Sequence, residues 1–355
     1  MNTENPKILY HSFNQDLNYF LIGTKEGCTI YKTYPLRTGF ELSKKICISG
    51  EFSMVKMLNS SNIFIIVGSP NNRYLSNKEV LVWDNKNEIK IYKFLIKKEV
   101  LNLELTSDKI IVVCENIIYI FNTKTFQLID IIKTGENLKG LIAVSYKERN
   151  ILVYPSKDIE HGKLTIKNYD TQSYIYLNPD KGEISKISLS YNGLFLATVI
   201  KEGSKENKII IFEAKTGRYL DEFTRYEEKG DNIKCISFNK DNNYISVSFT
   251  KGVIPLWSLK KAKELIGEPL DDIDKTTNIH GFAILSSNEQ AFNHVQLKDY
   301  NNPDYEIVKL GDKNYLYIIT KNGQYFVTKF EYSGKIKKKD GDFKVDDYSE
   351  IFKKK

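Results

Sequence analysis

One eight-residue phrase occurs twice in this sequence, more than two hundred residues apart. Residues 12–19 read SFNQDLNY and residues 237–244 read SFNKDNNY, so six of the eight positions are identical. A looser copy lies at residues 187–197. Each copy joins two apolar segments through Asp, Asn or Gly, the residues that tolerate the tight backbone angles of a hairpin. Internal repetition of this kind is the signature of a repeat architecture.

Apolar segments that end in an aromatic residue recur along the whole chain. Successive closing aromatics are 38 to 52 residues apart, and a four-stranded propeller blade takes roughly 40–45 residues. They are Tyr31, Trp83, Phe121, Tyr169, Phe212 and Trp257. A further strand pair, at residues 314–320 and 324–330, supplies a seventh unit. The sequence therefore predicts an all-β fold, a seven-bladed β-propeller of WD-repeat type over residues 1–334, with a charged C-terminal tail over residues 335–355.

A β-sandwich or a pair of stacked barrels is the alternative, because these folds also consist of short strands and frequent turns. Neither would be expected to restate one phrase at a blade-like spacing, so the propeller is favoured. The segment 260–278 is rich in Lys, Glu and Asp. It is predicted to form a surface loop or a short helix within the sixth blade.

The formal net charge of +7 favours acidic partners, either phosphoinositide membranes or nucleic acid. Basic clusters at residues 335–339 and 353–355 are interrupted by aspartates, so a solvated tail is expected there rather than nucleic-acid binding. The apolar runs have the length of strands and fall far short of the roughly 20 residues that a membrane helix needs. The N-terminus has no apolar leader. Any membrane contact is therefore expected to be peripheral.

Motifs of catalysis and metal binding are absent from the sequence. The four histidines and four cysteines show no metal-ligand spacing, and no nucleophile elbow, zincin or P-loop pattern occurs. The scattered cysteines are typical of small core residues in a reducing compartment. We expect a cytoplasmic, non-enzymatic protein without metal or cofactor, and a monomer, because a closed propeller has no sheet edge to hide.

Several longer stretches resemble one family of propellers. Residues 65–74 read IIVGSPNNRY and lead to LVWD at 81–84, and weaker matches lie at 139–145, 151–155 and 214–223. Over about residues 8–332 the chain is similar to the PROPPIN family, which includes the WIPI proteins of autophagy. The resemblance implies peripheral binding to phosphatidylinositol 3-phosphate or 3,5-bisphosphate on autophagic, endosomal or vacuolar membranes. In that family, two lipid pockets flank a Phe-Arg-Arg-Gly motif, and one arginine points to each.

This chain departs from that motif, because Phe223 is followed by Thr224, Arg225 and Tyr226. At the first pocket, Thr224 replaces an arginine and Ser204 keeps a hydroxyl. Asp180 falls near a family histidine, and Ile200 near a serine. An aspartate repels phosphate, so this pocket is expected to be disabled unless Lys201 or Lys205 compensates.

The second pocket keeps more of the family pattern. Arg225 is retained, and Ser248 and Lys251 match the stretch that lines this pocket. Phe249 and Val253 replace hydroxyl residues, and Gln296 lies near a family histidine. Guanidinium matches phosphate oxygens with a fixed fork of donors. The predicted phosphoinositide ligands are therefore Arg225, Ser248, Lys251, Ser204 and Thr224. The alternative is that Arg225 makes a surface ion pair with Glu227 or Glu228.

The resemblance also implies partners and a membrane loop. The loop expected in the sixth blade, residues 260–280, has no aromatic residue and offers Leu265, Ile266 and Leu270 for shallow insertion. The groove between the second and third blades is the family's partner site, here near Arg73, Lys78 and Lys97. Autophagy proteins of the lipid-transfer or conjugation machinery are the implied partners. The alternative function is a protein–protein scaffold that has lost lipid binding.

Overall fold

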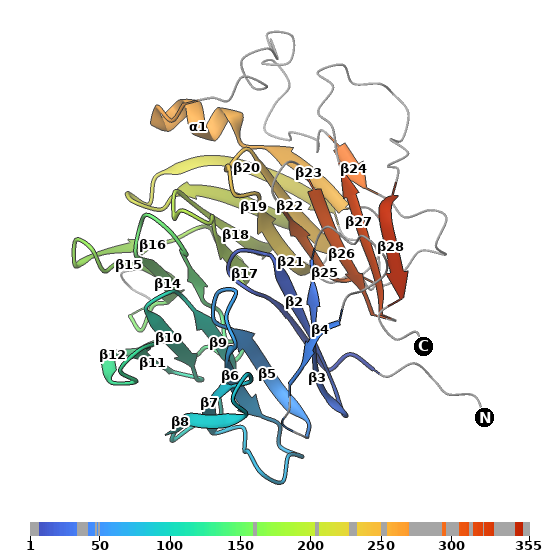
Figure 1. The fold of residues 1–355 in the computed structure, drawn as a ribbon. Coiled ribbons are helices and arrows are strands. Elements are labelled where there is room, and N and C mark those ends of the chain that lie inside the picture. The colour runs from blue at the N-terminus through green and yellow to red at the C-terminus, as the bar shows by residue number, and fades with distance from the viewer. Residues whose placement is uncertain are drawn as a thin grey trace.

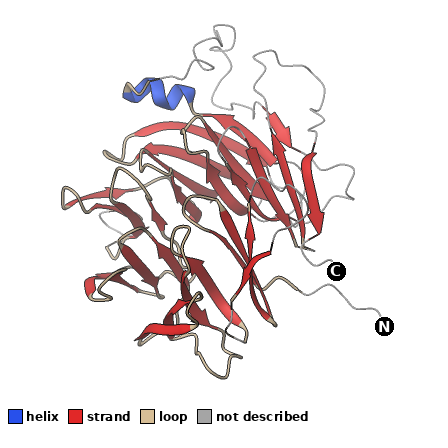
Figure 2. Cartoon of the chain, in the orientation of Figure 1, coloured by secondary structure: helices blue, strands red, loops and turns tan. Residues whose placement is uncertain are grey.

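A computed structural model describes most of the propeller (Figure 1). It covers residues 7–33, 42–46, 48, 50–158, 162–202, 206–226, 233–249, 254–269, 293–295, 305–311, 315–321, 323–329 and 345–350. The described strands form seven antiparallel sheets of four strands, and each sheet takes its strands in chain order. Strands dominate the described chain, with the helix on the rim of the ring (Figure 2). The predicted all-β, seven-bladed propeller is confirmed.

Each blade begins at the central axis and ends at the circumference, since the first strands of most neighbouring blades contact one another. The inner strands are β1 (Tyr10–Phe13), β5 (Phe52–Met57), β9 (Asn102–Leu105), β13 (Ala143–Val144), β17 (Glu183–Leu189), β21 (Ile233–Phe238) and β25 (Tyr305–Leu310). The second strands are β2 (Tyr19–Thr24), β6 (Ile63–Gly68), β10 (Lys109–Val113), β14 (Ile151–Pro155), β18 (Phe195–Glu202), β22 (Tyr244–Phe249) and β26 (Tyr315–Thr320).

The remaining strands lie farther out. The third strands are β3 (Gly27–Lys32), β7 (Glu79–Asp84), β11 (Ile117–Asn122), β15 (Leu164–Asn168), β19 (Glu206–Glu213), β23 (Ile254–Ser258) and β27 (Gln324–Lys329). The outer strands are β4 (Leu42–Lys45), β8 (Ile89–Leu95), β12 (Leu128–Lys133), β16 (Ser173–Leu177), β20 (Tyr219–Tyr226), β24 (Asn293–Val295) and β28 (Val345–Glu350). Helix α1 (Lys260–Ile266) follows β23.

The repeated phrase forms the turn between the first and second strands of a blade. In the first copy, the Asn14 carboxamide oxygen accepts a hydrogen bond from the Tyr19 amide at 2.9 Å. In the second copy, Asn239 accepts one from the Tyr244 amide at 2.8 Å. Both turns contain a residue with positive φ at the same place in the phrase. The sequence repeat is therefore a repeated turn, held by an asparagine that replaces a backbone acceptor.

Apolar side chains fill the spaces between blades, because both faces of each sheet pack on a neighbour. Every residue of β10 and β22 is buried, whereas β8 and β12 on the circumference are largely exposed. This explains why the second strands read as continuous apolar runs rather than as alternating ones.

The ring closes by packing between blade 7 and blade 1. Phe20 stacks on Tyr325 with ring centroids 4.8 Å apart, inside a cluster that draws on both blades. The buried Tyr325 hydroxyl donates a hydrogen bond to the Thr33 carbonyl oxygen at 2.9 Å. In the described sheets, blades 1 and 7 share no strand. Side-chain contacts therefore carry the closure.

The sequence also predicts the seventh blade and the segment after β23. The strand pair predicted for the seventh blade is present as β26 and β27, and a helix occurs within residues 260–278. Strand β28 lies inside residues 335–355, which the sequence predicts as a tail, and pairs with β27. This part of the segment completes the last blade. Among the described residues, no helix has the length and apolar character that crossing a bilayer requires.

Replacing Tyr325 with phenylalanine is expected to destabilise the protein by about 1 kcal/mol, because the change removes the bond to Thr33 and leaves a buried carbonyl unpaired. Urea unfolding of the purified chain measures this loss. Tyr74→Phe is the control, since Tyr74 is 81% exposed. Equal unfolding midpoints for Tyr325→Phe and the wild type would contradict a role for this bond in closure.

Candidate functional site

The predicted site lies at the end of β20, on the outer edge of blade 5. Phe223 is fully buried in the core between blades 5 and 6 and anchors the strand there. Since side chains alternate along a strand, the positions of Thr224 and Arg225 belong to opposite faces of the sheet. Thr224 is half-buried, and Arg225 is described through its backbone. Residues Ser204 and Lys251 lie outside the described residues.

Lysine occupies the strand position beside Thr224 on the face toward blade 4. Lys208 of β19 pairs in register with Thr224 on one side and with Ile200 on the other. Ile200 is buried in the core between blades 4 and 5, as expected for a residue without a donor. Lys208 thus stands directly across from Thr224, on the same face of the sheet.

Asp180 lies at this same place and is held by lysines. Its carboxylate accepts a hydrogen bond from the Lys208 ammonium at 2.8 Å. Lys163 donates to the carbonyl oxygens of Asp180 and Gly182, at 2.8 and 2.9 Å. The hydrogen bond from Lys208 lowers the pKa of Asp180 below its ordinary value. The Asp180 carboxylate is therefore charged, and Lys208 already balances its charge. The sequence alone does not indicate this ion pair, because its two residues lie 28 positions apart.

The face of blade 5 toward blade 6 presents a second row. Lys201, Asn207 and Arg225 are cross-strand neighbours on β18, β19 and β20. Asn207 is fully buried, and neither atom of its carboxamide has a hydrogen-bond partner in the described part of the chain. A buried amide without hydrogen bonds lowers the stability of the fold. Asn207 is therefore an unusual residue for a buried position in a strand. No pattern in the sequence points to Asn207, and only the strand register places it in this row.

Ser248 lies apart from this row. Ser248 lies on β22 and pairs with Cys235 of β21, and its hydroxyl is buried without a hydrogen-bond partner among the described groups. Its neighbours Val247 and Phe249 pack into the core between blades 5 and 6, so Ser248 belongs to the opposite face of the sheet. The structure thus brings Thr224 and Arg225 together on one strand and does not bring the Ser248 hydroxyl to them.

The helix that begins the sixth-blade segment is docked on the propeller. Ala262 is buried and Ile266 packs against the core between blades 5 and 6, whereas Leu265 is 42% exposed. Lys261 forms a 2.7 Å ion pair with Asp221 of β20. Of the three aliphatic residues expected to reach a membrane, Ile266 is thus committed to the core, Leu265 faces solvent, and Leu270 lies outside the described residues.

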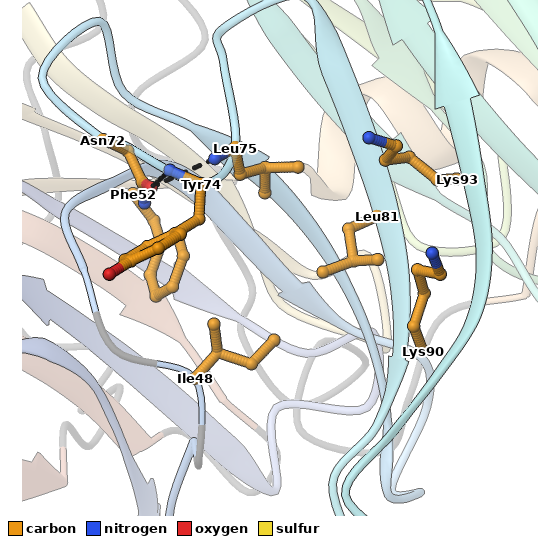
Figure 3. A pocket seen from close by; sticks show the side chains of 8 residues that line it. All are labelled: Ile48, Phe52, Asn72, Tyr74, Leu75, Leu81, Lys90 and Lys93. Carbon is orange, nitrogen blue, oxygen red and sulfur yellow. Dashed lines mark hydrogen bonds between the residues drawn. The ribbon is translucent and has the colours of Figure 1, made fainter.

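A cavity of about 180 Å³ lies on blade 2, beside the family-like stretch 65–74 (Figure 3). Its apolar wall consists of Ile48, Phe52, Leu75 and Leu81, with Asn72 and Tyr74 on one side and Lys90 and Lys93 on the other. Asn72 organises the loop, because its oxygen accepts the Tyr74 and Leu75 amides at 2.8 and 3.1 Å. Its nitrogen donates to the Glu51 carbonyl oxygen at 2.8 Å.

Gly68, within the same family-like stretch, allows the 69–76 loop to pack closely against the sheet. A Cβ atom at this position would lie 1.6 Å from the Leu75 carbonyl oxygen. The loop can therefore return to the sheet only because residue 68 has no side chain. Two residues of the family-like stretch, Gly68 and Asn72, thus hold the loop that lines this cavity.

A seven-bladed propeller with a basic rim on blade 5 is the class that fold and site define. The PROPPIN family profile matches residues 8–269, and the chain belongs to this family. It is 27% identical to Autophagy-related protein 18 of Dictyostelium discoideum over 72% of this chain and 66% of that protein. It is also 27% identical to Autophagy-related protein 18e of Arabidopsis thaliana, with the same coverage. The chain thus spans slightly less than two thirds of these relatives.

Solved structures agree on the fold. Hsv2 of Kluyveromyces lactis superposes with a TM-score of 0.71 at 20% identity, covering 98% of this chain and 99% of that one. KlAtg21, solved in complex with the coiled coil of AgAtg16, superposes with a TM-score of 0.72 at 16% identity, covering 97% and 99%. At these identities, the likeness supports the seven-bladed architecture.

Gly68→Ala is expected to destabilise the chain by several kcal/mol or to displace the 69–76 loop, because the new methyl group overlaps backbone. Gly267→Ala is the comparison. That glycine has φ of +71° and open space around it, so its replacement costs only about 1 kcal/mol of backbone strain. Urea unfolding separates the two. A smaller loss for Gly68→Ala than for Gly267→Ala would contradict the steric argument.

Proposed function

We propose that this chain is a non-catalytic, peripheral membrane propeller that binds phosphatidylinositol 3-phosphate or 3,5-bisphosphate. It would act in the cytoplasm, on autophagic, endosomal or vacuolar membranes, as an effector in autophagy or endolysosomal traffic. Membership of the PROPPIN family and the autophagy-related relatives support the setting. The observation that carries the proposal is the position of Arg225 at the end of β20, in one cross-strand row with Lys201 and Asn207.

This row has the chemistry of a phosphate site. Arginine remains charged at physiological pH and offers paired donors to phosphate oxygens. Lysine adds a second positive charge, whereas the Asn207 side chain is fully buried and lies beneath this row rather than in contact with a phosphate. In this proposal, Arg225 is the main ligand, and Ser204 and Lys251 contribute from the segments that follow β18 and β22. Ser248 supports the site from beneath rather than by contact, since its hydroxyl is buried.

The face toward blade 4 would form a weaker second site. There Lys208 takes the place of the missing arginine beside Thr224, and Lys163 adds charge. A phosphate must compete with the Asp180 carboxylate for the Lys208 ammonium. Lipid binding at this face is therefore reduced rather than abolished.

A protein-binding scaffold is the second candidate function. Arg73, Lys78 and Lys97, near the predicted groove between blades 2 and 3, are all exposed. The edge of blade 2 also exposes Leu95 and Tyr92, and the Tyr92 ring stacks on Phe126 of blade 3 at 5.2 Å. KlAtg21, which shares this fold, has been solved with a coiled coil bound. These features favour an extended partner with acidic side chains.

Arg225→Ala is expected to reduce flotation with liposomes that contain phosphatidylinositol 3-phosphate by at least tenfold, because the variant loses the main phosphate ligand. Arg218→Ala, at an exposed position where β20 begins, is the matched control and should float like the wild type. Equal flotation with and without the lipid would refute lipid binding. Retained capture of the AgAtg16 coiled coil, lost on charge reversal at Arg73, Lys78 and Lys97, would then favour the scaffold.

Asp180→Asn is expected to strengthen binding to the same liposomes by about threefold to tenfold, since the change frees the Lys208 ammonium for a phosphate. Glu99→Gln makes the same change of charge at an exposed site on the loop between blades 2 and 3 and serves as the control. Equal gains in both variants would show a general effect of charge. Unchanged binding in Asp180→Asn would remove Lys208 from the lipid site.

A further inference from the structure

One position of the inner strands forms a polar ring around the axis of the propeller. The last residue of every inner strand is apolar, whereas the penultimate residue is usually polar. The penultimate residues, from blade 1 to blade 7, are Ser12, Lys56, Glu104, Ala143, Ser188, Ser237 and Lys309. The residues that precede them are apolar apart from His11. A single polar level is thus enclosed between two apolar ones.

Hydrogen bonds from residues of this ring join neighbouring blades at three of its seven junctions in the described structure. Ser12 donates to the Val55 carbonyl oxygen, and Ser237 accepts from the Leu310 amide, both at 2.8 Å. The Lys56 ammonium lies 3.1 Å from the Glu104 carboxylate. The side chains of this last pair are 21% and 18% exposed, although both belong to innermost strands. Solvent therefore reaches the ring from the central channel.

The charges on the inner strands do not balance within the described side chains. Among the described side chains, the carboxylates there are Glu104 and Glu183, and each already holds a lysine, Lys56 and Lys139 respectively. The side chain of Glu306, on β25, lies outside the described part of the chain. Lys309 on β25 and Lys186 on β17 have no ion-pair or hydrogen-bond partner among the described residues. Lys309 is half-buried and Lys186 is exposed. Two ammonium groups, from blades 7 and 5, are thus available to an anion.

The lysines of the inner strands also affect the buried imidazole of His11. The pKa of His11 is lowered to about 3, first by burial and then by four ammonium groups. In decreasing order of effect, these belong to Lys56, Lys309, Lys234 and Lys186. All four lie on the innermost strands of different blades, β5, β25, β21 and β17, so their charges add at the axis rather than on one outer face.

We propose that the central channel binds a small multivalent phosphate, held by Lys309 and Lys186 with the Ser188 hydroxyl as a further donor. Ammonium groups on separate blades suit a ligand that carries more than one phosphate, because a single phosphate satisfies fewer of them. Ser188 belongs to the polar ring and is partly exposed, with no hydrogen bond to another described group. The site lies on the axis and is distinct from the lipid site on the rim of blade 5.

Isothermal titration of the full-length chain with pyrophosphate at low ionic strength tests this proposal. Saturable binding at one site per chain is expected, weakened at least tenfold in the double variant Lys186→Gln/Lys309→Gln. The control is Lys215→Gln/Lys321→Gln, which removes the same charge from exposed turns and should bind like the wild type. Urea unfolding midpoints verify that both double variants are folded.

Three outcomes would overturn the proposal. They are no saturable binding, equal loss in the two double variants, or loss in Arg225→Ala, which would place the phosphate on the rim. Soluble inositol 1,3-bisphosphate and liposomes with phosphatidylinositol 3-phosphate separate a free ligand from a lipid headgroup. The channel variant should lose the soluble ligand and keep liposome flotation. Loss of flotation alone would contradict the channel site and leave the rim proposal standing.

Discussion

Packing between the first and the last blade is the contact on which the remaining structure depends. Seven sheets surround the axis, and each buries its faces against two neighbours, so one open junction would expose two apolar faces. Here the junction is closed by the Phe20–Tyr325 stack and the hydrogen bond from Tyr325 to Thr33. Burial of aromatic surface supplies most of this stabilisation. The rim of blade 5 keeps its geometry only while the ring stays closed.

The inner and outer strands have different roles in this fold. Inner strands carry the hydrogen bonds that fix one blade to the next, as between Ser12 and Val55. Outer strands have one free edge, so their length and charge are less constrained. Strand β28, which reads VDDYSE, is an acidic example. Sites that vary within a family are therefore expected on outer strands, where β20 carries Arg225.

The sequence predicts the architecture well because the turn phrase is local. Asn14 and Asn239 act on amides five residues away, so a repeated phrase reports a repeated turn. Strand β28 could not be predicted from the sequence. An outer strand needs backbone pairing but no apolar face, and residues 345–350, which read VDDYSE, show no apolar pattern.

The site was harder to predict for a different reason. The partners of Asp180 come from other strands, Lys208 of β19 and Lys163 next to β15, and their proximity depends on register. The burial of Ser248 likewise depends on which face of β22 packs against blade 5. Matching residues to a family pattern identifies positions, whereas the direction of each side chain comes from the sheet.

The Lys208–Asp180 ion pair also determines how the two faces of blade 5 would respond to ionic strength. Added salt screens the attraction between phosphate and a cation, and it screens the competing attraction to the carboxylate as well. At the face with Lys208 these two effects oppose each other. At the face with Arg225, Glu183 pairs in register with Lys201, so a described carboxylate lies beside that row as well. Added salt would therefore change phosphate binding at either face less than it changes binding to a cation without a neighbouring carboxylate, and the Lys208–Asp180 pair moderates the response of its face to electrolyte.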